Sequence, residues 1–255
     1  MDLGLAGRRA LVLGSTSGLG RAVAAALAAE GAAVAIAGRD EGRAGSVGAA
    51  IGAAAALTVD LTEPGAGTRL VTDAVAALGG LDVVVVNTGG GTPGPILSTG
   101  GHDDAAYHSM LRPALEVSRA VAPHVSEGGE GRLVFMTARS VVEATPELAL
   151  SSVFRSGVAA AARSLALELA PHATVNVVVT GQFDTPALSR FETLRASREG
   201  QTVGEVREEH IAGIPMGRIG RAEELADVVV FLCSARASFV TGAVVRVDGG
   251  AVKGF

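Results

Sequence analysis

The sequence predicts an α/β protein built on one Rossmann-type, doubly wound parallel sheet of about seven strands, with helices on both faces to give three layers. Short apolar runs rich in Val alternate along the chain with longer amphipathic segments. Runs that are too short for a helix and lack polar alternation are typical of strands buried on both faces. The chain has 255 residues, of which 48% are hydrophobic, and no linker-like segment divides it. We therefore expect a single domain over residues 1–255.

The apolar runs predict strands at residues 10–13, 33–37, 55–59, 82–86, 133–136, 175–179 and 243–247. The segments between them predict helices at residues 19–30, 68–78, 103–124, 150–170 and 222–233. Several of these helices are followed by Gly or Pro, which commonly end helices. The Ala/Gly-rich residues 44–56 are interpreted as a surface helix. Residues 182–214 carry charges and aromatic side chains but no strand pattern, and we interpret them as a helical flap over the site.

Charge and composition exclude several classes of partner and site. The net charge is −5 and no cluster of Lys and Arg occurs, so neither nucleic acid nor an anionic membrane is an expected partner. No apolar run reaches the ~18 residues that a membrane helix needs, and the N-terminus lacks a signal-peptide pattern, so a cytoplasmic location is expected. The single cysteine, Cys233, lies in an apolar run and is interpreted as a buried core thiol. No cluster has metal-ligand spacing, so no metal site is expected.

A glycine-rich loop joins the first predicted strand to the first predicted helix. The loop consists of Gly14, Ser15, Thr16, Ser17, Gly18, Leu19 and Gly20. Gly14 permits a tight turn, while Gly18 and Gly20 allow the backbone to approach a pyrophosphate closely. The helix N-terminus adds backbone N–H donors and the positive end of a dipole. The loop therefore predicts a dinucleotide-binding site.

The end of the second predicted strand bears on the choice of dinucleotide. Arg39 is the first charged residue after that strand, and a basic residue near this point accommodates a 2′-phosphate. Asp40 follows directly, and an acid at this point would instead hold the ribose hydroxyls. The order of the two residues favours NADP(H) over NAD(H).

Further motifs continue this pattern along the chain. They are carried by Asp60, Leu61, Asn87, Gly89 and Thr185, and by residues 217–224 and 239–250. Together with the glycine-rich loop, they make the whole chain resemble the short-chain dehydrogenase/reductase family, including bacterial 3-oxoacyl-acyl carrier protein reductases. The resemblance implies that Asp60 meets the adenine amine, that Thr185 holds the nicotinamide amide, and that Leu61, Asn87 and Gly89 also contact the cofactor.

The helix that performs this family's proton chemistry departs from the family's pattern. The family has Tyr-x-x-x-Lys followed by Ala-Gly-Val, and residues 155–158 of this chain read Arg-Ser-Gly-Val. Arg155 therefore stands in the place of the Lys, where it would also contact the cofactor ribose, and Ser151 stands in the place of the Tyr. Ala138 stands where the family has a Ser, and either neighbour, Thr137 or Ser140, is a candidate replacement.

These changes weaken general acid catalysis. A phenol has a pKa near ~10 that a neighbouring ammonium can lower toward neutrality, whereas a serine hydroxyl is a far weaker acid. General acid catalysis is worth about 10²–10⁴ in rate, so the reduction of ordinary carbonyls should be slow. Arg155 can still donate to ribose hydroxyls or to a developing oxyanion, and Ser151 can donate or orient a water. Met110 replaces the family's Asn, and Tyr107, one turn earlier, is an alternative acid.

We therefore hypothesise an NADP(H)-dependent oxidoreductase of the ketoreductase type with an altered proton donor. Its catalytic residues would be Ser151, Arg155 and Thr137, and its substrate a small activated carbonyl, quinone or enone. Two alternatives remain: a non-redox lyase, isomerase or cyclase on the same fold, or an inactive cofactor-binding subunit. The resemblance also implies a homodimer or homotetramer formed through the two long central helices and the last strand.

Overall fold

The computed structural model describes residues 1–125 and 127–254, and its sheet confirms the predicted fold class. Seven parallel strands lie in the order β3-β2-β1-β4-β5-β6-β7. Their bounds are β1 Arg9–Val12, β2 Ala33–Gly38, β3 Ala55–Thr58, β4 Val83–Val86, β5 Gly131–Ala138, β6 Ala173–Thr180 and β7 Val244–Val247. All four residues of β4 are buried, as expected for the centre of a parallel sheet that helices cover on both faces.

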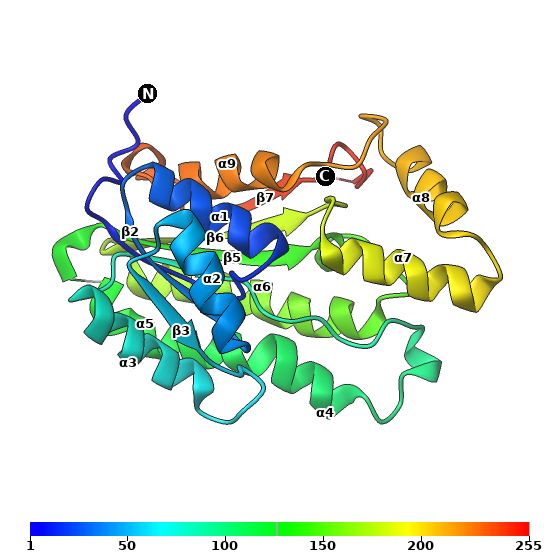
Figure 1. The fold of residues 1–255 in the computed structure, drawn as a ribbon, viewed down its shortest axis with the longest axis horizontal. Coiled ribbons are helices and arrows are strands. Elements are labelled where there is room, and N and C mark those ends of the chain that lie inside the picture. Colours follow the sequence, from blue (N-terminus) through cyan, green and yellow to red (C-terminus); the bar gives the residue numbers. More distant parts are fainter. Residues whose placement is uncertain (126, 255) are drawn as a thin grey trace.

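Helices cover both faces of this sheet (Figure 1). One face packs against α1 Gly18–Ala29, α2 Glu41–Ile51 and α9 Ala222–Cys233, and the other against α3 Ala66–Leu78, α5 Arg112–Val125 and α6 Ala149–Leu169. The three predicted layers are therefore present. Two further helices, α7 Pro186–Glu199 and α8 Val203–Ala212, lie together at one end of the molecule, within residues 182–214 (Figure 1).

Two of the expected helices differ from the structure in detail. The Ala/Gly-rich helix ends at Ile51 rather than at residue 56, because Gly52 adopts a left-handed conformation with φ 70° and β3 begins at Ala55. The helix predicted over residues 103–124 is divided into α4 Asp103–Ala106, a π-helical turn Tyr107–Leu111, and α5. Single π turns inside helices are rare, and a regular helix is the expectation from the sequence here.

The strand order creates the crevice that the site occupies. The chain builds β1, β2 and β3 outward to one edge of the sheet and then returns to place β4 on the other side of β1. Connections leave the carboxyl ends of β1 and β4 toward opposite faces, and ligands of open α/β sheets bind at such a reversal. The glycine-rich loop follows β1, and Asn87 follows β4.

Cys233 lies at the end of α9 and is 2% exposed, which confirms its interpretation as a buried core thiol. Burial raises the pKa of this thiol to about 12, so it stays protonated and unreactive at neutral pH. Among the described residues, no helix is long and apolar enough to cross a membrane.

Candidate active site

A cleft of about 560 Å³ opens at the carboxyl ends of the central strands. Most of the residues predicted to bind the cofactor or to act in catalysis line it. They are Gly14, Thr16, Ser17, Gly18, Leu19, Arg39, Asp60, Leu61, Asn87, Gly89, Thr137, Arg155 and Thr185. The remaining three predicted residues, Ser15, Gly20 and Ser151, are not part of the lining.

Ser15 and Gly20 support the glycine-rich loop from behind. The Ser15 side chain is fully buried, donates to the Val12 carbonyl at 2.6 Å and accepts from the Ala37 N–H at 2.9 Å. A Cβ on Gly20 would lie 2.3 Å from the carbonyl oxygen of Gly14, so only glycine fits there. These two residues shape the loop, and their direct contact with the cofactor stays a prediction.

The first turn of α1 offers backbone N–H donors to the cleft. Ser17 is the N-cap residue, and its side chain makes no capping hydrogen bond within the described residues. By contrast, Thr185 caps α7 by accepting a hydrogen bond from the Leu188 N–H at 3.3 Å. An uncapped helix start beside glycine suits an anionic group such as a pyrophosphate.

Asn87 holds the glycine-rich loop against the end of β4. Its Nδ2 donates to the carbonyl of Gly14 at 3.2 Å, and a Cβ on Gly14 would lie 2.8 Å from the backbone oxygen of Asn87. The contact joins the two strands that flank the crevice. Asn87 therefore helps to fix the loop as well as lining the cleft.

The far end of the cleft holds Arg39 and Asp60. Asp60 accepts hydrogen bonds from the Thr62 hydroxyl at 2.7 Å and from the Thr62 N–H at 2.9 Å. These bonds, with a smaller contribution from Arg39, hold the pKa of Asp60 below its usual value. Asp40 lies outside the lining, because its carboxylate caps α2 by accepting from the Arg43 N–H at 2.7 Å. The cation, not the neighbouring acid, therefore faces the ligand space.

Arg155 projects from α6 and binds the ends of two central strands. Its Nη2 donates to the carbonyl of Gly89 at 2.9 Å, and its Nη1 donates to that of Met136 at 3.4 Å. Burial lowers the pKa of the guanidinium to about 10, so it remains a cation at neutral pH. The residue places a fixed positive charge in the middle of the cleft.

Two serine hydroxyls meet beside this cation. The Oγ atoms of Ser140 and Ser151 lie 3.2 Å apart, and Ser140 is 4% exposed. Thr137 lines the cleft, but its hydroxyl donates to the carbonyl of Val178 on the neighbouring strand at 3.1 Å. Of the two hydroxyls that flank Ala138 in the sequence, Ser140 is therefore the one that contacts Ser151.

The other candidate acid and the replaced Asn position are placed away from the ligand space. Met110 is fully buried and packs with Ala106 and Leu150. The Tyr107 ring packs against the rings of His108 and Phe154 and is not among the described residues that line the cleft.

Among the described residues, five polar residues of the lining were not predicted as site residues: Thr62, Thr88, Ser109, Thr180 and Arg190. Ser109 and Arg190 project from helices. Ser109 lies in the π-helical turn, and its hydroxyl donates to the carbonyl of Gly90 at 3.0 Å. Arg190 reaches the cleft from α7, on the same helix face as Pro186 and Ala187. Neither belongs to a motif. For Arg190 the usable signal is its spacing of three and four residues from Ala187 and Pro186.

Three segments from different parts of the chain are joined to one another. Gly94 donates its N–H to the carbonyl of Glu147 at 2.7 Å and forms an isolated parallel bridge with Leu148. The Glu147 carboxylate pairs with Arg198 of α7 at 2.5 Å. The loop after β4, the loop before α6 and helix α7 are therefore linked in series.

The two helices of residues 182–214 share a buried polar cluster. The Glu192 carboxylate is 1% exposed and lies 3.1 Å from Nδ1 of His210 on α8. Arg207 pairs with Glu192 at 3.3 Å and with Asp184 at 2.8 Å. These contacts make α7 and α8 a single packed unit.

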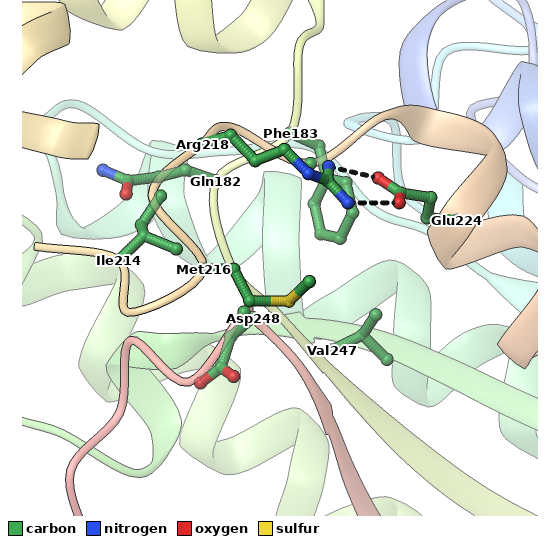
Figure 2. Close-up of a pocket in the computed structure, with 10 residues that line it drawn as sticks. Gln182, Phe183, Ile214, Met216, Arg218, Glu224, Val247 and Asp248 are labelled. Atoms are coloured by element: carbon green, nitrogen blue, oxygen red, sulfur yellow. Dashed lines mark hydrogen bonds and ion pairs between the residues drawn. The ribbon is translucent and has the colours of Figure 1, made fainter.

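A second cavity of about 110 Å³ lies between residues 182–183, residues 214–224 and the end of β7 (Figure 2). The Arg218 and Glu224 side chains point toward each other across it and form two hydrogen bonds of 2.8 and 2.6 Å. Asp248 accepts from the Gly250 and Val252 N–H groups. The charged groups of this cavity are thus engaged within the chain. No metal-binding group of His, Cys, Asp or Glu occurs in residues 1–125 and 127–254.

Comparison with known proteins agrees with this geometry. A family model described as Enoyl-(Acyl carrier protein) reductase matches residues 14–252. Cis-4-hydroxycyclohexanecarboxylate dehydrogenase from Sinomonas cyclohexanicum is 35% identical, over 98% of this chain and 98% of the relative. 2-Dehydro-3-deoxy-L-rhamnonate dehydrogenase (NAD(+)) from Sphingomonas sp. (strain SKA58) is 30% identical, over 96% and 95% respectively. The structure of L-sorbose reductase from Gluconobacter frateurii, complexed with NADPH and L-sorbose, has a TM-score of 0.92 and 26% identity over 100% of both chains.

Proposed function

Because the chain belongs to the short-chain dehydrogenase/reductase family and is an oxidoreductase, we propose that it uses NADP(H) to reduce a small activated carbonyl, quinone or enone without a phenolic proton donor. One observation carries the proposal: a cleft that otherwise suits a dinucleotide is lined by Arg155, in the place of the family's Lys. Ser151, one turn earlier on α6 and in the place of the family's Tyr, contacts Ser140 and is not itself part of the lining. Arg155 keeps the positive charge of the family's Lys, whereas Ser151 lacks the acidic phenol of the family's Tyr.

The preference for NADP(H) rests on this chain's own residues. The relative from Sphingomonas is named for NAD(+), whereas the Gluconobacter reductase is complexed with NADPH, so family membership alone does not choose between the cofactors. Arg39 lines the cleft while Asp40 is occupied as the N-cap of α2. A guanidinium that faces the adenosine end favours a 2′-phosphate.

The remaining contacts to the cofactor follow from the lining. The first turn of α1 would hold the pyrophosphate, Asp60 the adenine amine, and Arg155 the ribose of the nicotinamide half. Thr185 keeps its hydroxyl hydrogen, since its oxygen is an acceptor in the cap of α7, and would donate to the nicotinamide amide. When bound, the cofactor supplies the hydride.

The residues of the catalytic positions stabilise charge rather than transfer protons. Arg155 remains protonated at neutral pH and would stabilise negative charge on the acceptor oxygen. Ser151, held by Ser140, would donate a hydrogen bond to the same oxygen or to a water. The proton itself would come from water or from an acidic group of the substrate, which is why easily reduced acceptors are the expected substrates.

The first test is a titration with NADPH and, separately, with NADH, followed by nicotinamide fluorescence. The chain has no Trp, so protein fluorescence contributes little to the signal. We expect tighter binding of NADPH. Failure of both cofactors to bind would reject the proposal and return attention to non-redox chemistry.

The second test follows the hydride. NADPH carrying deuterium on one face of the nicotinamide is incubated with quinones, enones and oxoacyl thioesters, and the products are examined by mass spectrometry. We expect stereospecific transfer of deuterium to quinones or enones and little to unactivated ketones. Absence of transfer to every acceptor, in a protein that binds NADPH, would reject the reductase assignment and leave a cofactor-binding subunit.

A further inference from the structure

Arg190 is a cleft residue whose charge has no partner within the described part of the chain. It lies on the face of α7 that also presents Pro186 and Ala187 to the cleft. No hydrogen bond or ion pair joins its side chain to residues 1–125 or 127–254. A cation on this face is therefore available to a ligand.

The other arginines of α7 are occupied. Arg195 pairs with Glu199 at 2.9 Å and also with Glu209 of α8. Arg198 pairs with Glu147 at 2.5 Å and with Glu199 at 3.0 Å. Of the two acids on α7, Glu199 is paired with these arginines, and Glu192 is paired with Arg207 and His210 of α8. Arg195 and Arg198 therefore hold α7 to neighbouring parts of the protein, whereas Arg190 lines the cleft.

The charges of the cleft favour an anionic ligand near Arg190. Among the described residues, three arginines and one acid line it: Arg39, Arg155, Arg190 and Asp60. Arg39 lies by Asp60 at the adenosine end, and Arg155 is bonded to two carbonyls in the middle. Arg190 is the remaining cation, and an anion at its position would be matched by charge.

The N-cap of α7, five residues before Arg190, lies against the glycine-rich loop. A Cβ on Gly18 would lie 3.5 Å from both Cβ and Cγ2 of Thr185, so residues 185 and 18 are in close contact. Ser17 and Gly18 on one side, and Thr185 and Arg190 on the other, line the same cleft. In a dinucleotide fold, the group beside this loop is the pyrophosphate.

We propose that Arg190 binds the pyrophosphate of the dinucleotide and thereby fastens the flap, residues 182–214, to the bound cofactor. The inference rests on the proposed function, since it requires a dinucleotide in the cleft. It assigns different phosphates to two arginines: the 2′-phosphate to Arg39 and the pyrophosphate to Arg190. Because α7 and α8 are joined by the Glu192–His210 contact, both helices would be held when Arg190 is engaged.

The test compares Arg190→Ala with Arg39→Ala in three titrations, using NADPH, NADH and adenosine 2′-monophosphate. Loss of one charge-assisted hydrogen bond is worth about 10- to 100-fold in affinity. Arg190→Ala should lower the affinity for NADPH and for NADH by the same factor in this range. It should leave the affinity for adenosine 2′-monophosphate unchanged. Arg39→Ala should lower the affinity for NADPH and for adenosine 2′-monophosphate and leave the affinity for NADH unchanged. Arg190→Lys should recover part of the loss.

Arg163→Ala is the matched control, because Arg163 is an exposed arginine of α6 that does not line the cleft. It removes the same charge without a proposed contact. If Arg190→Ala binds both cofactors as Arg163→Ala does, the inference is wrong, while the proposed function stands as long as the unaltered protein binds NADPH. If Arg190→Ala changes only the KM of the acceptor, Arg190 belongs to the substrate site and the inference is also wrong.

Hydrogen exchange gives a readout that affinity alone does not. Saturating NADPH should slow amide exchange in α7 and α8 of the unaltered protein. In Arg190→Ala, measured at NADPH concentrations that saturate it, this protection should be lost while protection of the glycine-rich loop is kept. Equal protection of α7 in both proteins would show that the flap is not fastened through Arg190, and would overturn that part of the inference.

Discussion

At the level of single residues, replacing Ser151 tests whether the catalytic positions still act on the substrate. We expect Ser151→Ala to lower kcat about fivefold to tenfold, the effect of one lost neutral hydrogen bond, and to leave the Kd for NADPH unchanged. Ser152→Ala is the control, because its hydroxyl donates to the Leu148 carbonyl of its own helix at 3.2 Å. Steady-state kinetics with the best acceptor measures both. Equal kcat for the two variants would mean that Ser151 only fills space.

His210 makes the stability of the flap depend on pH. Burial lowers the pKa of its imidazole, although the hydrogen bond with Glu192 opposes the shift. The unfolded chain therefore binds this proton at a higher pH than the folded chain does. The stabilising contribution is present above the unfolded pKa of ~6.5 and decreases as the pH falls from there toward the lower folded pKa.

The corresponding experiment measures the free energy of unfolding in urea at about pH 7.5 and about pH 5.5. We expect the unaltered protein to lose stability at the lower pH by more than His210→Gln does. His172→Gln, at an exposed histidine, should keep the full pH dependence of the unaltered protein. If His210→Gln and the unaltered protein have the same pH dependence, the titrating group lies elsewhere.

Among the helices and strands, local spacing predicted nearly every element, and long-range contacts explain the differences. Strands β5 and β6 extend beyond their predicted apolar runs because they contain buried polar residues. Arg132 of β5 donates to the carbonyl of Ser234, and Thr180 of β6 donates to that of Thr137, partners that are distant in sequence. A prediction based on hydrophobicity ends a strand at such residues, because it contains no information about the distant groups that accept their hydrogen bonds.

The residues of the site also divide into those that local sequence predicts and those that depend on long-range packing. The glycine-rich loop was predictable because its chemistry lies within consecutive residues. The Ser140–Ser151 contact and the position of Arg190 depend on how α6 and α7 pack, so residue spacing within one motif does not reveal them. Sequence spacing also suggested Ser15 as a contact, whereas its side chain turns into the protein to join two strands.

A carboxylate on α5 stabilises the start of α3. The Glu116 carboxylate on α5 accepts from the N–H groups of Gly65 and Gly67 at 3.0 and 2.9 Å, at the start of α3. We expect Glu116→Ala to destabilise the protein by about 2 kcal/mol, because two N–H groups lose a charged acceptor. Urea unfolding measures this. Glu168→Ala, at an exposed acid of α6, should cost much less, and an equal cost would contradict the assignment.

For the molecule as a whole, the outer surface of α6 bears on assembly. Leu167 is 83% exposed and Val153 is 55% exposed, and both lie on a helix that the family resemblance assigns to subunit contacts. We expect a homodimer or homotetramer, and we expect Leu167→Glu to reduce its mass in light scattering. Leu194→Glu, on α7, is the control at a 60% exposed leucine. An unchanged mass for Leu167→Glu would place the interface elsewhere.

The serial link between Gly94, Glu147 and Arg198 has a kinetic consequence. We expect these linked segments to lie over a bound product, which would then leave only after the bridge or the ion pair opens, whereas the reaction itself would need no such movement. Escape should therefore be slower than chemistry for acceptors that are easily reduced. Rapid mixing of the NADPH complex with such an acceptor should give a burst of about one equivalent of oxidised cofactor per site before a slower steady phase. Arg198→Ala should raise the steady rate and leave the burst rate unchanged.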